Sequence, residues 1–246
     1  MNCSMTMLSV NLNKVALLRN ARAGSAPSVM EAAELCLAVG AGGITVHPRP
    51  DQRHARTHDV CDLAALIRTS PGCELNVEGN PTPEFLDLVR QTRPTQCTLV
   101  PDAPEVLTSD HGWDLTAEGE RLRPLISELQ ALGIRISLFM ETDPRQIELA
   151  GAIGAERIEL YTEPYARAYG TGAESTQLQR FARAAHLAGQ VGLGVNAGHD
   201  LSLENLGAFC AAVPQLLEVS IGHALISNSL EMGLGEAVRA YLRVLS

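Results

Sequence analysis

The sequence is poor in lysine and has no run of basic residues. Of its 246 residues, 19 are lysine or arginine and 28 are aspartate or glutamate, so the net charge is −9. Lys14 is the only lysine. An acidic chain without a basic stretch does not attract the phosphate backbone of nucleic acids or an anionic membrane surface. We therefore expect neither a nucleic acid nor a membrane as a partner.

Other absences narrow the class of protein further. No apolar run approaches the roughly 18 residues of a membrane helix, and residues 1–10 lack the segments of a secretory signal. The six cysteines include no C-x-x-C pair, so we expect reduced thiols in a cytoplasmic protein. The hydrophobic fraction, 46%, is enough for one large core.

Short β-rich apolar runs alternate with longer segments of helical period. The predicted strands are 8–13, 43–47, 74–78, 96–101, 135–140, 157–162, 192–197 and 217–222. The predicted helices are 28–39, 59–69, 82–91, 115–132, 143–153, 174–188, 202–213 and 223–245. Strands that are each followed by a helix indicate a parallel sheet built from βαβ units.

An open, doubly wound sheet would give a similar local pattern. The count of eight strands and the lack of a glycine-rich dinucleotide turn after the first strand favour a closed sheet. We therefore predict an α/β fold, a (β/α)8 TIM barrel, as a single domain over residues 1–246. Such barrels need about 250 residues.

Polar residues follow nearly every predicted strand, and in this fold the C-terminal strand ends face the active-site mouth. His47, His199 and His223 follow three different strands, and histidine titrates near neutral pH. Glu78 would lie near the barrel axis, where an unpaired charge is costly, so we expect it to be paired, protonated or catalytic. Glu159, inside a strand, is either functional or a structural carboxylate paired with arginine.

Several features predict a site for small phosphorylated substrates. Gly222 and His223 stand where the last strand becomes a helix, and the free N–H groups of helix N-termini bind phosphate. A second glycine, Gly198, follows the seventh strand. A second anion would be held by arginines, because basic residues cluster early in the chain, at Lys14, Arg19, Arg22, Arg49 and Arg53.

These positions belong to a set of motifs that spans almost the whole chain. The motifs are V-N-L-N-K-V-A-L-L-R-N-A-R (10–22), G-I-T-V-H-P-R-P-D-Q-R-H (43–54), L-N-V-E-G (75–79), T-L-V-P-D (98–102), I-E-L-Y-T (158–162), V-N-A-G-H (195–199) and S-I-G-H-A-L-I (220–226). In order and spacing, the set closely resembles the pyridoxine 5'-phosphate synthase family.

The resemblance implies a ring-closing step of vitamin B6 synthesis. In it, 1-deoxy-D-xylulose 5-phosphate and 3-amino-2-oxopropyl phosphate condense to pyridoxine 5'-phosphate, releasing phosphate and water. It implies His47 and Glu78 as acid–base residues, His199 as proton donor and Glu159 as a transition-state stabiliser. Proton transfers suffice for this chemistry, so we expect no cofactor and no metal. The resemblance also implies a homo-octamer.

The resemblance further implies which residues bind substrate. Asn11 and Arg22 would hold the amino-ketone phosphate, and Gly222 and His223 would lie at a phosphate. The deoxyxylulose phosphate would be met by Arg49, His54 and Thr108. Two long segments, 102–114 and 163–174, are candidate lids over the substrates.

The chain departs from the family's pattern at three places. Many members read Asp-His at Asn13-Lys14, so the chain lacks a carboxylate there and puts a cation in the deoxyxylulose site. Many have glycine at Asp200, whose carboxylate suits a helix cap. The third departure is Ser227-Asn228, which replaces a common glycine–arginine pair. We still count Asn13, Lys14 and Asp200 among the substrate-binding residues.

Three other functions stay open from the residues alone. Lys14 at the mouth would suit a Schiff-base aldolase acting on a phosphorylated sugar. His54, His58 and Cys61 have a spacing that could clasp a metal, although nearby arginines repel cations, and the H-x-H strand signature of a metal-dependent hydrolase is missing. The third possible function is that of a non-catalytic barrel that binds phosphate.

Overall fold

The computed structural model of the chain describes residues 6–102, 109–213 and 215–246. Parallel strands in chain order form a closed barrel in which β8 pairs with β1. The strands are β1 (Met7–Asn11), β2 (Gly43–Val46), β3 (Glu74–Gly79), β4 (Gln96–Leu99), β5 (Arg135–Met140), β6 (Arg157–Tyr161), β7 (Gly194–Gly198) and β8 (Leu216–Ile221). The predicted (β/α)8 TIM barrel is confirmed.

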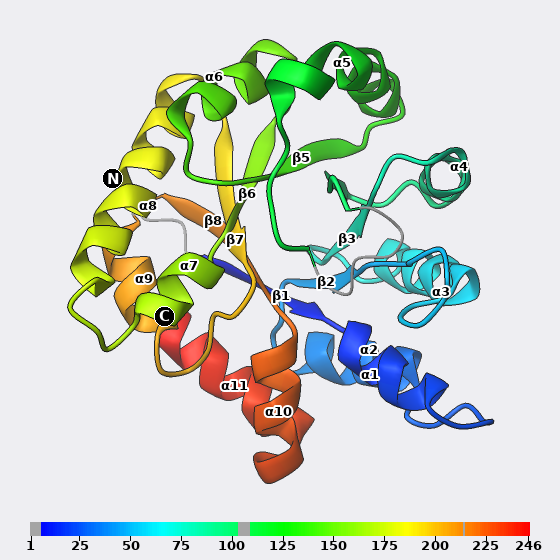
Figure 1. Cartoon of the computed structure of the whole chain (residues 1–246). Helices are drawn as coiled ribbons and strands as arrows, with labels where there is room; N and C mark the ends of the chain where they lie inside the picture. Colours follow the sequence, from blue (N-terminus) through cyan, green and yellow to red (C-terminus); the bar gives the residue numbers. More distant parts are fainter. Residues whose placement is uncertain (1–5, 103–108, 214) are drawn as a thin grey trace.

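Helices form a ring around the strands (Figure 1). They are α1 (Asn13–Asn20), α2 (Val29–Ala38), α3 (Thr57–Arg68), α4 (Pro83–Thr92), α5 (Leu115–Ala131), α6 (Pro144–Ala152), α7 (Glu163–Ala168), α8 (Glu174–Gln190), α9 (Leu206–Ala212), α10 (His223–Met232) and α11 (Leu234–Leu245). No helix in these described segments is long and apolar enough to cross a bilayer.

Capping side chains start several helices close to the predicted positions. Ser28, Thr82 and Asp143 each accept a hydrogen bond from the backbone N–H three residues later, and proline follows directly after Thr82 and Asp143. A side-chain acceptor there satisfies a backbone donor that the helix itself cannot pair. Local sequence therefore sets where α2, α4 and α6 begin.

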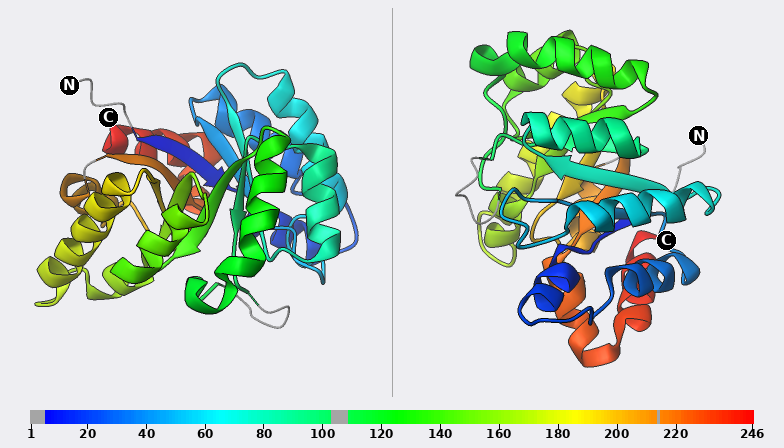
Figure 2. Two further views of the ribbon diagram at one scale, coloured as in Figure 1. Left: turned by 90° about the horizontal axis from the view of Figure 1, so that it is seen from above. Right: turned by 90° about the vertical axis from the view of Figure 1, so that its right-hand side faces the viewer.

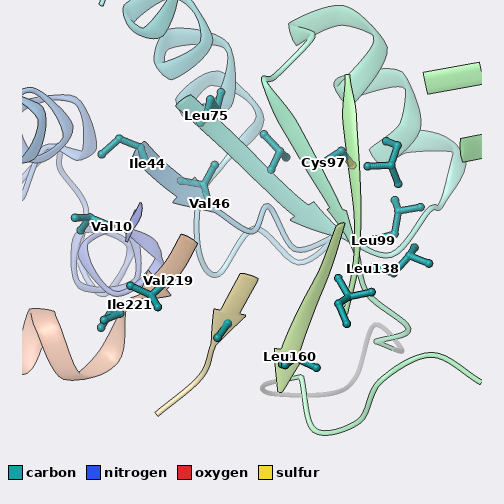
Figure 3. Packing of buried hydrophobic residues seen from close by; sticks show 14 of the residues in the cluster. Val10, Ile44, Val46, Leu75, Cys97, Leu99, Leu138, Leu160, Val219 and Ile221 are labelled. Atoms are coloured by element: carbon teal, nitrogen blue, oxygen red, sulfur yellow. The ribbon is translucent and has the colours of Figure 1, made fainter. Parts of the chain in front are cut away.

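Side chains alternate along each strand between an apolar and a polar environment. Val10, Ile44 and Leu138 belong to a buried apolar cluster that also includes Leu63 of α3 (Figure 3). Most of the intervening residues are polar and meet inside the barrel, where Ser9 Oγ lies 2.7 Å from Thr45 Oγ1, and Phe139 of β5 is an apolar exception. The apolar core therefore lies between strands and helices, and the barrel interior is left for polar groups.

The first strand is shorter than predicted. It ends at Asn11, and Asn13 and Lys14 lie in the first turn of α1, a helix that the sequence analysis did not predict. The Asn11 side chain accepts a hydrogen bond from the Asn13 N–H at 3.0 Å, and the Asn13 side chain accepts one from the His47 N–H at 2.8 Å. These two bonds turn the chain out of the sheet.

Two further segments differ from the prediction. The expected helix 223–245 is divided into α10 and α11 at Gly233, whose φ of 82° is easily reached only by glycine. The candidate lid 163–174 contains the short helix α7, which has a proline in its first turn. Packing places α1 beside α10 and α2 beside α11, as Figure 2 also shows.

Candidate active site

A cavity of about 270 Å³ lies at the C-terminal ends of the strands. It contains nearly all the predicted site residues, because the ends of parallel strands meet on one side of a barrel. Those that line it are Asn11, Asn13, Lys14, His47, Arg49, His54, Glu78, Glu159, His199, Asp200, Gly222 and His223. Arg22 is exposed in the loop after α1 and does not line it. Thr108 lies outside the described residues.

His47 and Glu78 form one half of the site. His47 follows β2 and Glu78 lies near the end of β3, and the His47 Nδ1 atom is 3.8 Å from Glu78 Oε2. Burial, followed by the charges of Glu218 and Asp102, raises the pKa of Glu78 to about 8. Burial and the nearby Arg49 hold the pKa of His47 well below its usual value. At neutral pH the carboxyl therefore holds its proton and the imidazole is uncharged.

His199 and Glu159 form the other half. The His199 Nδ1 atom lies 4.0 Å from Glu159 Oε1, and burial is the main cause that lowers the pKa of His199. The Phe139 and Tyr161 rings flank the imidazole, with centroids 4.8 Å and 5.5 Å from it. The two rings thus pack against the imidazole, and the Glu159 carboxyl lies beside it at the mouth of the cavity.

The backbone at His199 and Asp200 has an uncommon conformation. His199 and Asp200 have φ angles of 76° and 59°, the left-handed region that non-glycine residues rarely adopt. Thr162 Oγ1 donates to the carbonyl oxygens of both Gly198 and His199. Such strained residues persist where surrounding bonds hold them, and they concentrate at functional sites.

Glu159 is buried, with only 1% of its surface exposed. A Cβ atom on Gly198 would lie 2.4 Å from Glu159 Oε1, so glycine is needed there. Burial and the charges of Glu78 and Glu218 raise the pKa of Glu159 well above its usual value. Among the described residues its ion-pair partner is His199, and no arginine lies within ion-pair distance of its carboxylate. The arrangement suits a protonated carboxyl that changes charge during a reaction.

Positive groups line the side of the cavity next to the β2–α3 connection. Arg49 Nη2 lies 2.8 Å from Asp102 Oδ2, which also accepts a hydrogen bond from Ser109 Oγ at 2.6 Å. Burial, followed by the charges of Lys14, Arg49 and Arg53, lowers the pKa of His54 to about 4. This cationic wall favours an anionic ligand.

Another wall of the cavity includes the start of α10, which follows β8. Gly222, His223 and Ala224 line the cavity, and the N-cap residue Gly222 has no side chain with which to cap the first N–H groups of the helix. A Cβ atom on Gly222 would lie 3.1 Å from Asn11 Cβ, so the close approach of β1 and β8 here depends on glycine. Uncapped N–H groups beside a cavity can bind a phosphate.

Three polar lining residues were missed by the sequence analysis: Tyr161, Ser220 and Ser109. Tyr161 follows Glu159 by two positions and Ser220 precedes Gly222 by two. Because side chains two apart on a strand share a face, that spacing was a usable signal for both. Ser109 reaches the cavity through its bond to Asp102, which no local pattern indicates.

The possible metal site at His54, His58 and Cys61 is not formed. His54 lines the cavity, whereas the His58 side chain is 60% exposed and its Nε2 lies 3.5 Å from Asp59 Oδ1. No group of three histidine, cysteine or acidic residues suited to a metal occurs in the described parts of the chain.

Known proteins match the chain over nearly its full length. A family model described as "Pyridoxal phosphate biosynthesis protein PdxJ" matches residues 8–246. The pyridoxine 5'-phosphate synthase of Albidiferax ferrireducens is 56% identical over 246 residues, covering 98% of both chains. That of Xanthomonas axonopodis pv. citri is 55% identical, covering 98% of this chain and 96% of the relative.

Solved structures share the architecture at low identity. A Mycobacterium tuberculosis tryptophan synthase chain superposes with a TM-score of 0.68 at 12% identity, covering 98% of this chain and 93% of that chain. A phosphoribosylanthranilate isomerase from Thermotoga maritima gives a TM-score of 0.59 at 12% identity, covering 98% of each. At this identity the likeness shows the fold alone.

Proposed function

Because the chain belongs to the PdxJ family of pyridoxal phosphate biosynthesis proteins, we propose that its cavity forms pyridoxine 5'-phosphate, the product in its relatives' name. The chain is an enzyme of vitamin B6 biosynthesis. The reaction condenses 1-deoxy-D-xylulose 5-phosphate with 3-amino-2-oxopropyl phosphate to pyridoxine 5'-phosphate, phosphate and water.

The observation that carries the proposal is the meeting of two histidine–glutamate pairs in one cavity. His47 with Glu78 and His199 with Glu159 come from four different strands. Imine formation, dehydration and ring closure each move a proton, and a general acid or base accelerates such steps by about 10²–10⁴-fold. Two pairs in one cavity supply both acids and bases.

In this proposal the two pairs divide the proton transfers. Glu78 is mostly protonated at rest, and its ionised form removes a proton from the carbon next to an imine. Neutral His47 lies beside it and exchanges that proton with it. His199 donates a proton to a leaving group and takes a proton from the protonated Glu159 beside it. Glu159 stabilises positive charge that develops on the substrate, because its ionised form becomes favourable once a cation lies beside it.

The two walls of the cavity take the two phosphorylated substrates. The start of α10 with Gly222 and His223, and Asn11 beside it, would hold the amino-ketone phosphate. The cationic wall with Lys14 and Arg49, and the uncharged His54 beside them, would hold the deoxyxylulose phosphate, and Asn13 and Asp200 complete the lining. Arg22, which does not line the cavity, and Thr108, which lies outside the described residues, stay proposals from the family resemblance.

We also propose that the enzyme works in the cytoplasm as a homo-octamer. The described cysteines Cys36, Cys61, Cys73, Cys97 and Cys210 are all free thiols, which suits a reducing compartment. Exposed Leu17, Leu18 and Leu230 on α1 and α10 offer apolar surface for contacts between subunits. Sedimentation that reports a monomer at assay concentration would contradict the octamer.

The decisive experiment is a turnover assay with purified protein, both phosphorylated substrates and no added metal. It follows pyridoxine 5'-phosphate and free phosphate together, in wild type and in His199→Asn and Glu78→Gln. We expect both products from wild type and a loss of about 10²-fold or more in each variant. Release of phosphate without ring product would contradict the proposed reaction.

Borohydride added to the same assay mixture tests the alternative enzyme class. A Schiff-base aldolase would form a covalent imine on Lys14 that borohydride reduces to a stable adduct. We expect no such adduct by mass spectrometry. An adduct on Lys14 without pyridoxine 5'-phosphate would replace the present proposal with the aldolase.

A further inference from the structure

Helix α1 is attached at both of its ends to the segment between β2 and α3. At its start, Asn13 accepts a hydrogen bond from the His47 N–H at 2.8 Å. At its end, Arg19 and Asn20 reach residues 52–59. The segment held in this way carries Arg49 and His54, which line the cavity.

The Asn20 side chain makes the densest of these contacts. Its Nδ2 atom lies 3.0 Å from the carbonyl oxygen of Gln52, 3.0 Å from that of Arg53 and 2.8 Å from that of His54. Three consecutive carbonyl groups thus converge on one amide nitrogen. Gln52 has a left-handed φ of 56°, so the chain turns sharply where the amide holds it.

Arg19 fixes the orientation of that amide. Its Nε atom donates to Asn20 Oδ1 at 3.1 Å, which leaves the amide nitrogen facing the carbonyl groups. Its Nη2 atom lies 2.8 Å from Asp59 Oδ2, which also accepts from the Arg56 N–H at 2.7 Å. Arg19 and Asp59 are 5% and 3% exposed, so this support is shielded from water and from salt.

The held segment presents His54 to the cavity. His54 is 7% exposed, and its Nδ1 atom has no hydrogen-bond partner among the described residues. Lys14, on the same helix as Asn20, also lines the cavity. Helix α1 therefore contributes one cation directly and fixes the backbone that carries its neighbours.

We infer that Asn20 is a positioning residue that, by gripping the carbonyl groups of residues 52–54, holds His54 at the cationic wall of the cavity. It does not touch substrate. It acts on binding by keeping the wall formed before the ligand arrives, which reduces the ordering cost of binding. The identity of that ligand, the deoxyxylulose phosphate, rests on the proposed function.

Steady-state kinetics of Asn20→Ala tests this inference, with Gln130→Ala as the matched control. Gln130 is also a helix carboxamide that bonds a distant backbone carbonyl, that of Gly154 at 2.9 Å, but it does not line the cavity. We expect Asn20→Ala to raise KM for the deoxyxylulose phosphate about tenfold, the effect of losing a set of partly buried hydrogen bonds that orders the wall. We expect kcat and KM for the amino-ketone phosphate to change less than about twofold in both variants.

A second readout does not depend on turnover. The His54 imidazole is titrated by NMR, assigned by His54→Gln. It faces Lys14 of α1 and Arg49, Asp51 and Arg53 of its own segment, and its charge lowers the pKa of His47. Burial and these cations hold its pKa at about 4, so release of the segment in Asn20→Ala will move it upward, toward the usual value. Gln130→Ala will leave it in place.

The outcomes are separable from those of the proposed function. If wild type does not turn the two substrates over, the proposed function fails and the His54 titration still decides the role of Asn20. If Asn20→Ala is unfolded by circular dichroism, Asn20→Ser, which keeps one hydroxyl donor, replaces it in both measurements. An unchanged His54 pKa with an unchanged KM, or a kcat loss with no KM effect, overturns the inference.

Discussion

The Nδ1 atom of His47 lies 3.8 Å from Oε2 of Glu78, and their side chains are only 8% and 7% exposed. Neither group carries a charge at rest, because burial favours the neutral form of each. The separation is too long for a hydrogen bond, so a small movement of either side chain must bring the two atoms together before a proton passes between them. Any proton that the pair takes up or gives away leaves a buried charge, so each transfer must be reversed within the reaction cycle.

The pH dependence of the reaction should report Glu78. Burial raises its pKa to about 8, and the base is the ionised form. Below pH 8 the ionised fraction falls tenfold per pH unit, so kcat/KM should rise with pH and level off above about 8. Stopped or continuous assays from pH 6 to 9 measure this.

The variant Glu78→Gln should lose about 10²–10⁴-fold in kcat/KM and show no such rise. Glu118→Gln, at an exposed carboxylate on α5 paired with Arg121, is the control and should keep the wild-type profile. A wild-type profile that is flat from pH 6 to 8 would remove Glu78 from the role of base.

Gly198→Ala should displace Glu159. The new Cβ would lie 2.4 Å from Glu159 Oε1 and 3.3 Å from the Ser220 carbonyl oxygen, so the carboxyl must move away from His199. We expect kcat to fall at least tenfold, with a stability cost of about 1–3 kcal/mol from overpacking. Gly172→Ala is the matched control, since a Cβ there meets nothing within 4 Å. Equal kcat in the two variants would contradict a role for Glu159.

Glu218→Gln should stabilise the fold more strongly as pH rises. Burial raises the pKa of Glu218 to about 7, so between about pH 4.5 and 7 the folded chain keeps a proton that the unfolded chain has lost. Stability from this group is therefore lost as pH rises through 7, and glutamine, which does not ionise, avoids that loss.

The substitution can keep the local hydrogen bonds, because Gln96, Arg157 and Asn196 all donate to Oε2. Thermal or urea unfolding should show a difference near zero at pH 5 and about 1–3 kcal/mol in favour of Glu218→Gln at pH 8. A difference of the opposite sign at pH 8 would mean that the ion pair with Arg157 outweighs burial.

Lys14→Met should weaken binding of the phosphorylated ketose. It removes a cation that lines the cavity and keeps a similar length of side chain. We expect KM to rise about tenfold, and the salt dependence of KM to become shallower because one charge contact is lost. Arg180→Met, at an exposed cation on α8, should leave KM unchanged. Equal salt dependence in wild type and Lys14→Met would exclude a direct contact with the anion.

The strand pattern and the ends of the strands could be predicted because they depend on the order of residues within short segments. Strand β5 has the predicted bounds, 135–140, and the start of α4 at Thr82-Pro83 follows from one cap and one proline. Chain order in a barrel brings the carboxyl ends of all strands to one mouth. His47, Glu78 and His199 could therefore be assigned to a common site from their positions alone.

Helix α1 and the hydrogen bonds from Asn20 to residues 52–54 could not be predicted from local sequence. The segment 13–20 has no side-chain cap at its start, and it is held by residues 47–59, more than thirty positions away in several of its bonds. The break between α10 and α11 likewise depends on the conformation that Gly233 adopts, which the apolar pattern around it does not indicate.

Residue types and their period along the chain determined the barrel, its polar mouth and the candidate acids and bases, because these follow from contacts between neighbours in sequence. Only the tertiary structure decided which groups meet, as Gln96 and Glu218 do across 122 positions. It also decided which groups are charged, because the pKa of Glu78 depends on how many atoms of other segments exclude water from it.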